Sequence, residues 1–220
     1  TQFDRAEIKR FDALLRPLST EQRRASDGAL AITTLAAYDW RGNQRYASYP
    51  IAGSAPYGDT AEGVRHTFDA LGREISVARD AGSDGVLTTG TAYLSGARRK
   101  ITDPRTNETI TTFQVFDAPS YEQPLRVQAP EGVEQVIDRN IYGEAGAIHQ
   151  LAGDPRGSKQ YVYDAFHRVC RVIEPETGNT VMQYDGADNV VQTARGIAVT
   201  GTGCLPAADM PAGATVVRGF

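Results

Sequence analysis

The sequence predicts an all-β protein of antiparallel hairpins that form a twisted, elongated and curved sheet. Three observations support this fold: a short turn signature that recurs along the chain, alternating strand-like segments beside it, and 22 glycines in 220 residues. Glycine averages about 7% of residues, and a chain with many tight turns needs the excess. Helical periodicity is weak. The best helical candidate, residues 20–34, contains Gly28 and β-branched residues, so a strand with a long loop explains it as well.

The recurring signature is an aromatic residue, then aspartate, a few small residues, and an arginine or asparagine five positions after the aromatic. Its clearest copies are FDALGR at 68–73, YDAFHR at 163–168 and YDGADN at 184–189. The aromatic anchors, 21 to 30 residues apart, are Phe11, Tyr38, Phe68, Tyr93, Phe116, Tyr142, Tyr163 and Tyr184. Aspartate does not follow Tyr93 or Tyr142, so we expect these two to be degenerate copies. Recurrence at uneven spacing indicates repeated structural units joined by loops of variable length.

Each signature is predicted to be the turn of a β-hairpin. Period-two segments rich in Val, Ile, Thr and Tyr flank the copies, as at residues 64–68 and 159–163. Aspartate is favoured at the first position of a type I turn, because its carboxylate accepts backbone N–H bonds, and glycine at the fourth, where φ can be positive. We therefore expect Asp69 to bond amides of its own loop and Gly72 to have positive φ.

A second class of turn, built on proline or glycine, is predicted between the signatures. Examples are residues 103–107 (DPRTN), 154–157 (DPRG) and 174–179 (EPETGN). Each unit then reads strand, signature turn, strand, second turn, which is an antiparallel meander. The repeats continue without a clear linker and predict one elongated domain over residues 1–195. Residues 196–220, rich in Gly, Ala and Thr, are expected to form an irregular C-terminal segment.

The aromatic anchors are expected to pack between neighbouring hairpins rather than to face solvent. We predict that Phe68, Phe116, Tyr163 and Tyr184 are mostly buried at equivalent places in successive hairpins. The alternative is that aromatic rings on an exposed β surface stack on sugars.

Charge and composition argue against several classes of function. The net charge is −4 and no basic patch is evident, which argues against nucleic-acid binding; the densest basic run, residues 98–100, is interpreted as a solvated strand or loop. No apolar stretch approaches the roughly 20 residues of a membrane helix. The two cysteines, Cys170 and Cys204, are predicted to be free thiols, with a single disulfide as the alternative.

No catalytic, cofactor-binding or metal-binding residue is predicted. His66, His149 and His167 are far apart and form no metal-ligand spacing. The recurring aspartates lack the dense acidic pattern of a calcium loop, so turn capping explains them better. No pair of carboxylates stands out for glycoside hydrolysis, and no nucleophile elbow, P-loop or dinucleotide motif is present. We therefore expect no enzymatic activity in this segment.

The linked copies resemble the RHS or YD repeat family. The resemblance is clearest from Tyr163 to Asp185, where YDAFHRV, EPETGNT and YD follow one another, and it extends over roughly residues 11–193. Members of this family include bacterial RHS toxins, the encapsulating subunits of Tc toxins, wall-associated bacterial proteins and animal teneurins, whose repeats form a sheet that spirals into a hollow shell. Two departures are the short chain and the stretch at 154–157, where Ser158 stands in place of the leucine of the DPxGL-like end of the shell core; we interpret that stretch as a turn.

The resemblance implies a structural role as part of a β shell that encloses or presents a C-terminal toxin in a secreted or cell-surface bacterial protein. Expected partners are neighbouring repeats or the enclosed toxin, with no cofactor and no nucleic acid. The alternative is an extracellular module that binds glycans or a partner protein through an exposed β surface. Because end strands carry unpaired backbone groups, we also expect the chain either to associate edge to edge or to cover its edges with its irregular termini.

Overall fold

The computed structural model describes residues 5–24, 27–115, 120–151, 157–211 and 215–216, and within them the protein is all-β. Its strands are antiparallel in every pairing given by the register of these residues, which confirms the predicted fold class. The helical elements of the described residues are single 3₁₀ turns: η1 (Gly82–Asp84), η2 (Pro130–Gly132) and η3 (Ala207–Asp209). No helix in this part of the chain is long and apolar enough to cross a membrane.

The chain forms two compact units, Thr1–Ala92 with Ile101–Glu108, and Tyr93–Lys100 with Thr109–Phe220. The strands whose residues fall within the first unit are β1 (Arg5–Phe11), β2 (Pro17–Arg24), β3 (Leu30–Tyr38), β4 (Gln44–Ser48), β5 (Ile51–Ala52), β6 (Gly63–Phe68) and β7 (Glu74–Asp80). The strands β8 (Val86–Leu94), β9 (Arg98–Thr102) and β10 (Glu108–Phe113) contain residues of both units. The later strands of the second unit are β11 (Pro124–Gln128), β12 (Glu134–Arg139), β13 (Ala145–Gln150), β14 (Lys159–Tyr163), β15 (Val169–Glu174), β16 (Gly178–Tyr184), β17 (Val190–Ile197) and β18 (Thr215–Val216).

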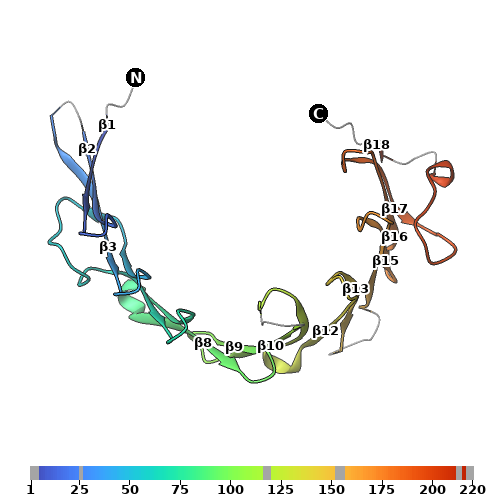
Figure 1. Ribbon diagram of the computed structural model, residues 1–220, viewed down its shortest axis with the longest axis horizontal. Helices are drawn as coiled ribbons and strands as arrows, with labels where there is room; N and C mark the ends of the chain where they lie inside the picture. The colour runs from blue at the N-terminus through green and yellow to red at the C-terminus, as the bar shows by residue number, and fades with distance from the viewer. Residues whose placement is uncertain (1–4, 25–26, 116–119, 152–156, 212–214, 217–220) are drawn as a thin grey trace. The chain divides into compact units, whose positions relative to one another are not determined.

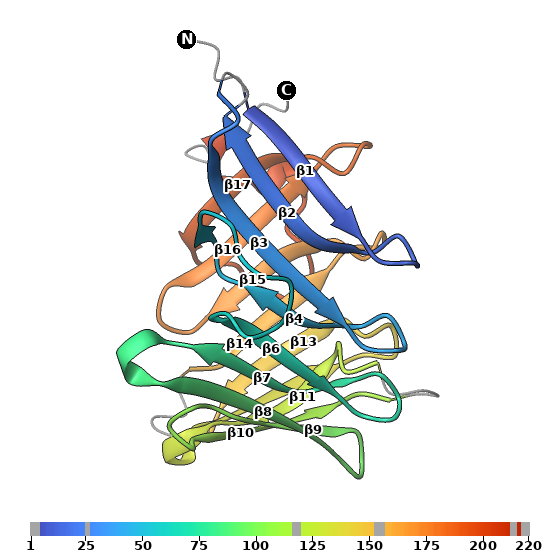
Figure 2. The ribbon, with the colours of Figure 1, turned by 90° about the vertical axis from the view of Figure 1, so that its left-hand side faces the viewer.

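Within each unit, strands that follow one another in sequence form hairpins. In the first unit β1 pairs with β2, β2 with β3, β3 with β4 and β6 with β7, as the side-by-side blue and teal ribbons of Figure 2 show. The short strand β5 is an exception, since it returns to β3, and β4 pairs directly with β6. In the second unit the meander runs from β11 through β17, in the yellow to orange part of Figure 1. The predicted meander is confirmed in both units.

A register shift recurs just beside the signature turn. In six hairpins the last residue of the first strand pairs with the residue six positions later. The residue seven positions later has no partner in the pairing. The first residues of these pairs are Phe11, Tyr38, Phe68, Arg139, Tyr163 and Tyr184, and the residues that the pairing skips are Leu18, Arg45, Ile75, Gly146, Cys170 and Val191. A bulge of this kind increases local strand twist. The repeat therefore includes a bulge as well as a turn.

Each unit has a small buried core on its sheet. In the first unit Tyr46 is completely buried, and its hydroxyl donates to the carbonyl of Ala61 at 2.8 Å in the loop after β5. The guanidinium of Arg65 lies 5.3 Å from the centre of the same ring. In the second unit Val181 is 1% exposed and pairs across the sheet with the buried Ala194. In both cores a loop covers one face of the sheet.

Two predicted anchors differ from the structure. Tyr93 does not begin a signature turn: Gly96 and Ala97 both have positive φ, as in a tight two-residue turn, and the Tyr93 ring packs edge-on against Tyr121 at 5.1 Å. Tyr142 lies inside a signature turn whose first residue is Asn140, and Arg139 stands in the place of the aromatic anchor. The sequence was misread because an aromatic residue stands at the tip of this turn and not before it. The predicted anchor Phe116 and residues 154–156 lie outside the described residues.

The predicted second class of turn is only partly separate from the first. Residues 103–107 adopt the signature geometry although Thr102, not an aromatic residue, precedes them: the Asp103 carboxylate accepts from the amides of Arg105 and Asn107, both at 2.8 Å. Residues 174–178 form a different turn, with Gly178 at φ +82°. The sequence analysis assigned this segment to the second class because of the proline at position 104. The fixed φ of proline suits the second position of both kinds of turn, so the proline does not distinguish them.

Candidate functional site

The signature turn is a closed set of hydrogen bonds around one carboxylate. In the copy at 69–73, Asp69 Oδ1 accepts from the amides of Leu71 and Arg73, both at 2.9 Å, and Oδ2 accepts from Arg73 Nε at 2.8 Å. The Gly72 amide donates to the Asp69 carbonyl at 3.0 Å, and Gly72 has φ +79°. Both predictions for this turn, the aspartate that caps its own loop and the positive φ of Gly72, are confirmed.

The same arrangement recurs in seven turns. The first residues of these turns are Asp12, Asp39, Asp69, Asp103, Asn140, Asp164 and Asp185, and the partners four residues later are Arg16, Asn43, Arg73, Asn107, Glu144, Arg168 and Asn189. The turn at Asn140 exchanges the roles, since the Asn140 amide donates to Glu144 at 2.6 Å while Asn140 Oδ1 accepts from the amides of Tyr142 and Glu144. The position requires a short side-chain acceptor and a complementary partner, and more than one residue pair meets this requirement.

These hydrogen bonds keep the turn aspartates ionised. The backbone amide of Arg73 is the main cause that holds the pKa of Asp69 below its ordinary value, and the Asn189 side chain has this role for Asp185. Their carboxylate oxygens are occupied within the turn. Among the described residues, no group of three or more His, Cys, Asp or Glu is placed to hold a metal ion. Turn capping, the interpretation made from the sequence, accounts for the recurring aspartates.

Arginines join one turn to the next. Arg16 Nη1 donates to the carbonyl of Asp39 at 3.1 Å, and its guanidinium lies 4.7 Å from the centre of the Tyr38 ring. In the second unit Arg168 Nη1 donates to the carbonyl of Asp185 at 3.0 Å, and the guanidinium of Arg168 lies 4.6 Å from the centre of the Tyr184 ring. The arginine that closes one turn therefore clamps the anchor of the following repeat. We call this pair of contacts the arginine clamp.

The aromatic anchors Phe68, Tyr163 and Tyr184 occupy equivalent places at the ends of their strands and are mostly buried. The Tyr163 hydroxyl donates to the carbonyl of Ala145 at 3.1 Å, and the Tyr184 hydroxyl donates to the matching Val169 carbonyl at 2.8 Å. Burial raises the pKa of both hydroxyls. Phe68, Tyr163 and Tyr184 are intermediate in exposure, so each is mostly but not completely buried, and the prediction is confirmed for these three. Each anchor is the last residue of its strand and stands next to the exposed turn.

The tips of the signature turns carry the most exposed large apolar side chains of the described residues. These seven side chains are 68% to 84% exposed, and they are Leu14, Leu15, Trp40, Leu71, Ile141, Tyr142 and Phe166. The turns at the other ends of the strands are different, because residues 82–85 are Gly, Ser, Asp and Gly, and residues 175–177 are Pro, Glu and Thr. One edge of each unit is therefore apolar at its turns, and we call the seven side chains the tip residues. Exposed apolar side chains gathered in this way mark interaction surfaces.

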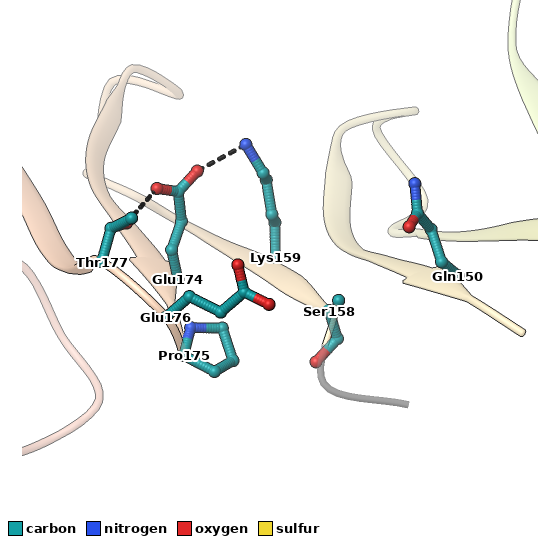
Figure 3. A pocket seen from close by; sticks show the side chains of 8 residues that line it. Gln150, Ser158, Lys159, Glu174, Pro175, Glu176 and Thr177 are labelled. Atoms are coloured by element: carbon teal, nitrogen blue, oxygen red, sulfur yellow. Dashed lines mark hydrogen bonds and ion pairs between the residues drawn. The ribbon is translucent and has the colours of Figure 1, made fainter. Parts of the chain in front are cut away.

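Two of the hollows in the described part of the chain bear on the candidate functions, and both contain polar side chains. The first, of about 310 Å³, is lined by residues of β13, β14 and the turn after β15 (Figure 3). Glu174 accepts from Lys159 and from the Thr177 hydroxyl, both at 2.5 Å. The Lys159 hydrogen bond is the main cause that lowers the pKa of Glu174. An ionised, paired carboxylate suits a structural ion pair, whereas a general acid of a glycosidase needs a raised pKa.

The second hollow, of about 360 Å³, lies beside the exposed Trp40 in the first unit. Its lining includes Arg41, Arg45, His66 and Phe68. His66 Nδ1 is 2.6 Å from Glu74, and Arg45 pairs with Asp59 at 2.7 Å. The other two histidines also contact carboxylates, His149 with Asp138 and His167 with Glu144. Each of the three histidines therefore contacts a different carboxylate.

The cysteines and a buried arginine are the features that sequence reasoning missed. Cys170 and Cys204 form a disulfide with their Cα atoms 5.5 Å apart, so the prediction of free thiols is wrong. The next residue, Arg171, is 3% exposed. No signal in the spacing could have found this pair, because the loop that brings Cys204 back to β15 does not follow the repeat.

No protein-family model matches the sequence, and no curated protein is significantly similar to it. Solved structures do match. The chain is similar to part of TcdB2–TccC3 without its hypervariable C-terminal region, with a TM-score of 0.51 and 14% identity, over 87% of this chain and 12% of that one. It also matches the Tc holotoxin pore of Photorhabdus luminescens, with a TM-score of 0.37 and 13% identity over 87% and 12% of the two chains. At this identity the first match establishes a shared fold alone.

The class that fold and turns define is therefore an antiparallel β-hairpin repeat array, of the kind found within TcdB2–TccC3. The chain spans about 12% of the length of the structures that it matches.

Proposed function

We propose that this chain is a structural repeat segment of a larger bacterial protein of the RHS or YD type, in which it forms part of the wall of a β shell. The observation that carries the proposal is the arginine clamp. Arg16 and Arg168 each close their own turn and also bind the next repeat. A repeat that is linked to its neighbour in this way is suited to extend a sheet. The fold shared with part of TcdB2–TccC3 supports the same role.

The proposed role needs no enzymatic turnover in this segment. The recurring polar residues are engaged in turn geometry, and Glu174, which Figure 3 shows joined by dashed lines to Lys159 and Thr177, is ionised and paired. By resemblance to the family, the shell would enclose or present a C-terminal toxin.

A secreted or cell-surface location is part of the proposal. The disulfide between Cys170 and Cys204 supports it, since disulfides form and persist in oxidising compartments and are rare in the cytosol.

The proposed partners are neighbouring repeats of the parent chain and the enclosed toxin domain. The tip residues offer an apolar contact along one edge of each unit. Tryptophan and arginine are enriched in protein interfaces, and Trp40 lies 4.7 Å from the guanidinium of Arg41.

The test is cryo-electron microscopy of the longer protein that contains this segment with its flanking repeats. We expect the segment in a continuous β wall, with one face toward an enclosed space that holds the C-terminal domain. Substitution of both clamps, Arg16→Met with Arg168→Met, should make the enclosed domain more sensitive to protease. Arg105→Met, at an exposed turn tip, is the matched control. A segment that projects from the particle as a separate module would contradict the proposal.

A glycan-binding module is the second candidate, and the exposed Trp40 beside its hollow favours it. The chain has a single tryptophan, so its fluorescence reports directly on this place. Titration with bacterial and host oligosaccharides should change the emission if sugars stack on Trp40. Tyr142→Ala, at a tip in the second unit, should leave such a change intact. Unchanged emission across the panel would reject this candidate.

A further inference from the structure

The loop that follows β17 covers one face of β15 and β16. Arg171 on β15 donates to the carbonyls of Val199 at 3.1 Å, Gly201 at 2.9 Å and Gly203 at 3.3 Å. On β16, Asn179 donates at 2.8 Å to the carbonyl of Ile197, the last residue of β17, from which the loop departs. The Gln183 side chain, also on β16, donates to the carbonyl of Leu205 at 2.5 Å. Residues 197–205 therefore form a cover held by side chains of two strands.

The recurring bulge explains how two adjacent residues reach this cover. Cys170 is the residue that the pairing of β14 with β15 skips, since Val162 pairs with Arg171 and Tyr163 with Val169. In a regular strand, neighbours point to opposite faces. Here Arg171 binds the loop carbonyls while Cys170 is bonded to Cys204 of the same loop. The covalent and the hydrogen-bonded attachments thus hold one segment.

The loop supplies most of the hydrogen-bond acceptors for the buried charge of Arg171. Its Nε donates to Asn179 Oδ1 at 2.9 Å, and its other side-chain hydrogen bonds within the described residues go to the three loop carbonyls. A buried charge is costly unless its hydrogen bonds are satisfied. If the loop leaves, Arg171 loses these carbonyls and becomes solvated in the same step. The covered and uncovered arrangements are therefore distinct states.

The two sulfurs differ in access. Cys204 is exposed, whereas Cys170 is 4% exposed and its sulfur lies 3.3 Å from the carbonyl of Val162. A thiolate approaching from solvent meets Cys204 first. Attack there forms a mixed disulfide with Cys204 and releases Cys170 as the thiolate, which takes up a proton. A second thiol of the attacking molecule then displaces Cys204.

We propose that the Cys170–Cys204 bond is a thiol–disulfide exchange site through which a dithiol reductant uncovers the face of β15 and β16 that carries Arg171, Asn179 and Val181. The protein disulfide gains two electrons and two protons to become two thiols. The dithiol loses the same and becomes a cyclic or protein disulfide. Once the covalent attachment is lost, the cover is held by hydrogen bonds alone and opens. The inference does not depend on the shell role.

The test uses the full chain in native buffer with dithiothreitol, followed by alkylation with iodoacetamide and mass spectrometry. We expect both cysteines to become alkylated without global unfolding. When the reaction is quenched early, we expect Cys170 to be alkylated while Cys204 still carries dithiothreitol as a mixed disulfide. Hydrogen exchange of the amides of residues 197–205 should accelerate at least tenfold, while β2 and β3 keep their protection. Reoxidation with oxidised glutathione should restore slow exchange.

Two variants distinguish thiol–disulfide exchange at this site from the simple loss of a crosslink. In Cys204→Ser, hydrogen exchange of the amides of residues 197–205 should be fast without reductant and should not change further when reductant is added. Arg171→Lys keeps the charge but loses the planar fork of donors, so its disulfide should be reduced several-fold faster. A disulfide that resists dithiothreitol until the chain unfolds would overturn the proposal, and so would a reduced protein whose loop remains as protected as before.

Discussion

At the residue scale, one short acidic side chain organises each repeat. Asp69 accepts two amides and one guanidinium, and the turn then closes through Gly72 in a left-handed conformation. Where glycine is absent, other residues adopt the same backbone, as Leu15 does at φ +60° and His167 at φ +63°. The turn thus tolerates a strained residue because the carboxylate bonds hold the loop.

Gly72→Val should destabilise the hairpin of β6 and β7 by about 1–3 kcal/mol, since a β-branched side chain fits a positive φ badly. A Cβ at Gly72 meets nothing within 4 Å, so the cost would come from the backbone alone. The measurement is urea unfolding. Gly90→Val is the control, because Gly90 is in β8 with equal space and valine suits a strand. Equal stability of the two variants would contradict the left-handed turn.

Tyr184→Phe should lower the free energy of unfolding by about 0.5–1.5 kcal/mol, because the hydroxyl bond to the Val169 carbonyl is lost. Tyr184→Ala should cost more, about 1–3 kcal/mol, yet less than a fully buried aromatic residue, since the ring is not completely buried. Thermal unfolding of both variants tests the order. A Phe variant as unstable as the Ala variant would show that the hydroxyl dominates and that the ring contributes little.

At the element scale, the hairpin is turn, bulge and clamp together. The bulge shifts the second strand by one residue just after the turn, in the same place in six hairpins. This shift allows Cys170 and Arg171 to contact one loop. The clamp then connects successive hairpins, so a substitution in one repeat is felt in the next.

Arg168→Met should raise hydrogen exchange in two turns, its own and the one at Asp185, because Arg168 binds Asp164, the Asp185 carbonyl and Asp188. Arg168→Lys should restore protection only in part, since lysine lacks the planar fork of donors. Arg105→Met is the control. Exchange that rises in the Asp164 turn alone would show that the clamp does not couple repeats.

Acid should destabilise the hairpins through the turn carboxylates. The folded-state pKa of Asp69 and Asp103 is lowered from 3.8, chiefly by the Arg73 amide and by the Asn107 side chain respectively. The unfolded state therefore binds protons first, so the stabilisation is complete above about pH 4 and is lost as the pH falls through the lowered folded values. Circular dichroism from pH 7 to pH 2 measures this loss. Asp69→Asn should weaken the pH dependence, and a variant as acid-sensitive as the parent would refute the assignment.

At the scale of the whole molecule, the C-terminal residues cover part of the sheet. β18 pairs with β17 through Gln192 with Val216 and Thr193 with Thr215, and residues 197–205 lie over β15 and β16. The expectation that irregular C-terminal residues cover an edge is therefore met at β17. An edge strand without such a partner is a template for pairing with another chain.

Truncation should separate the two parts of this cover. A chain ending at Pro211 loses β18 but keeps the loop and the disulfide, whereas one ending at Ala194 loses Cys204 and the acceptors of Arg171 as well. We expect light scattering to show the least self-association for the full chain, more for the chain that ends at Pro211, and most for the chain that ends at Ala194. The chain that ends at Ala194 should also lose the most thermal stability. If all three are monomeric and equally stable at high concentration, edge exposure does not govern the behaviour of the chain.

The sequence by itself determined the features that depend on neighbouring residues. The aspartate, the glycine and the alternating strands act within a few positions, so the hairpins, their turns and the all-β class could be predicted, and Gly72 and Asp69 follow the prediction. The predictions were wrong where the aromatic residue does not directly precede the turn. Tyr93 precedes a different turn, Tyr142 lies at a turn tip, and the turn at residues 103–107 has no aromatic residue before it. Local chemistry allows several residues to fill one turn position.

Only the tertiary structure decided which distant residues meet. The bond of Cys170 to Cys204 and the carbonyls around Arg171 depend on a loop that returns 28 to 34 residues later along the chain. The path of such a loop is set by what the sheet leaves uncovered, and no local pattern encodes it. Strand pairing also brings successive turns to one edge of the sheet. Only this pairing places Leu14, Trp40 and Leu71 at neighbouring turn tips.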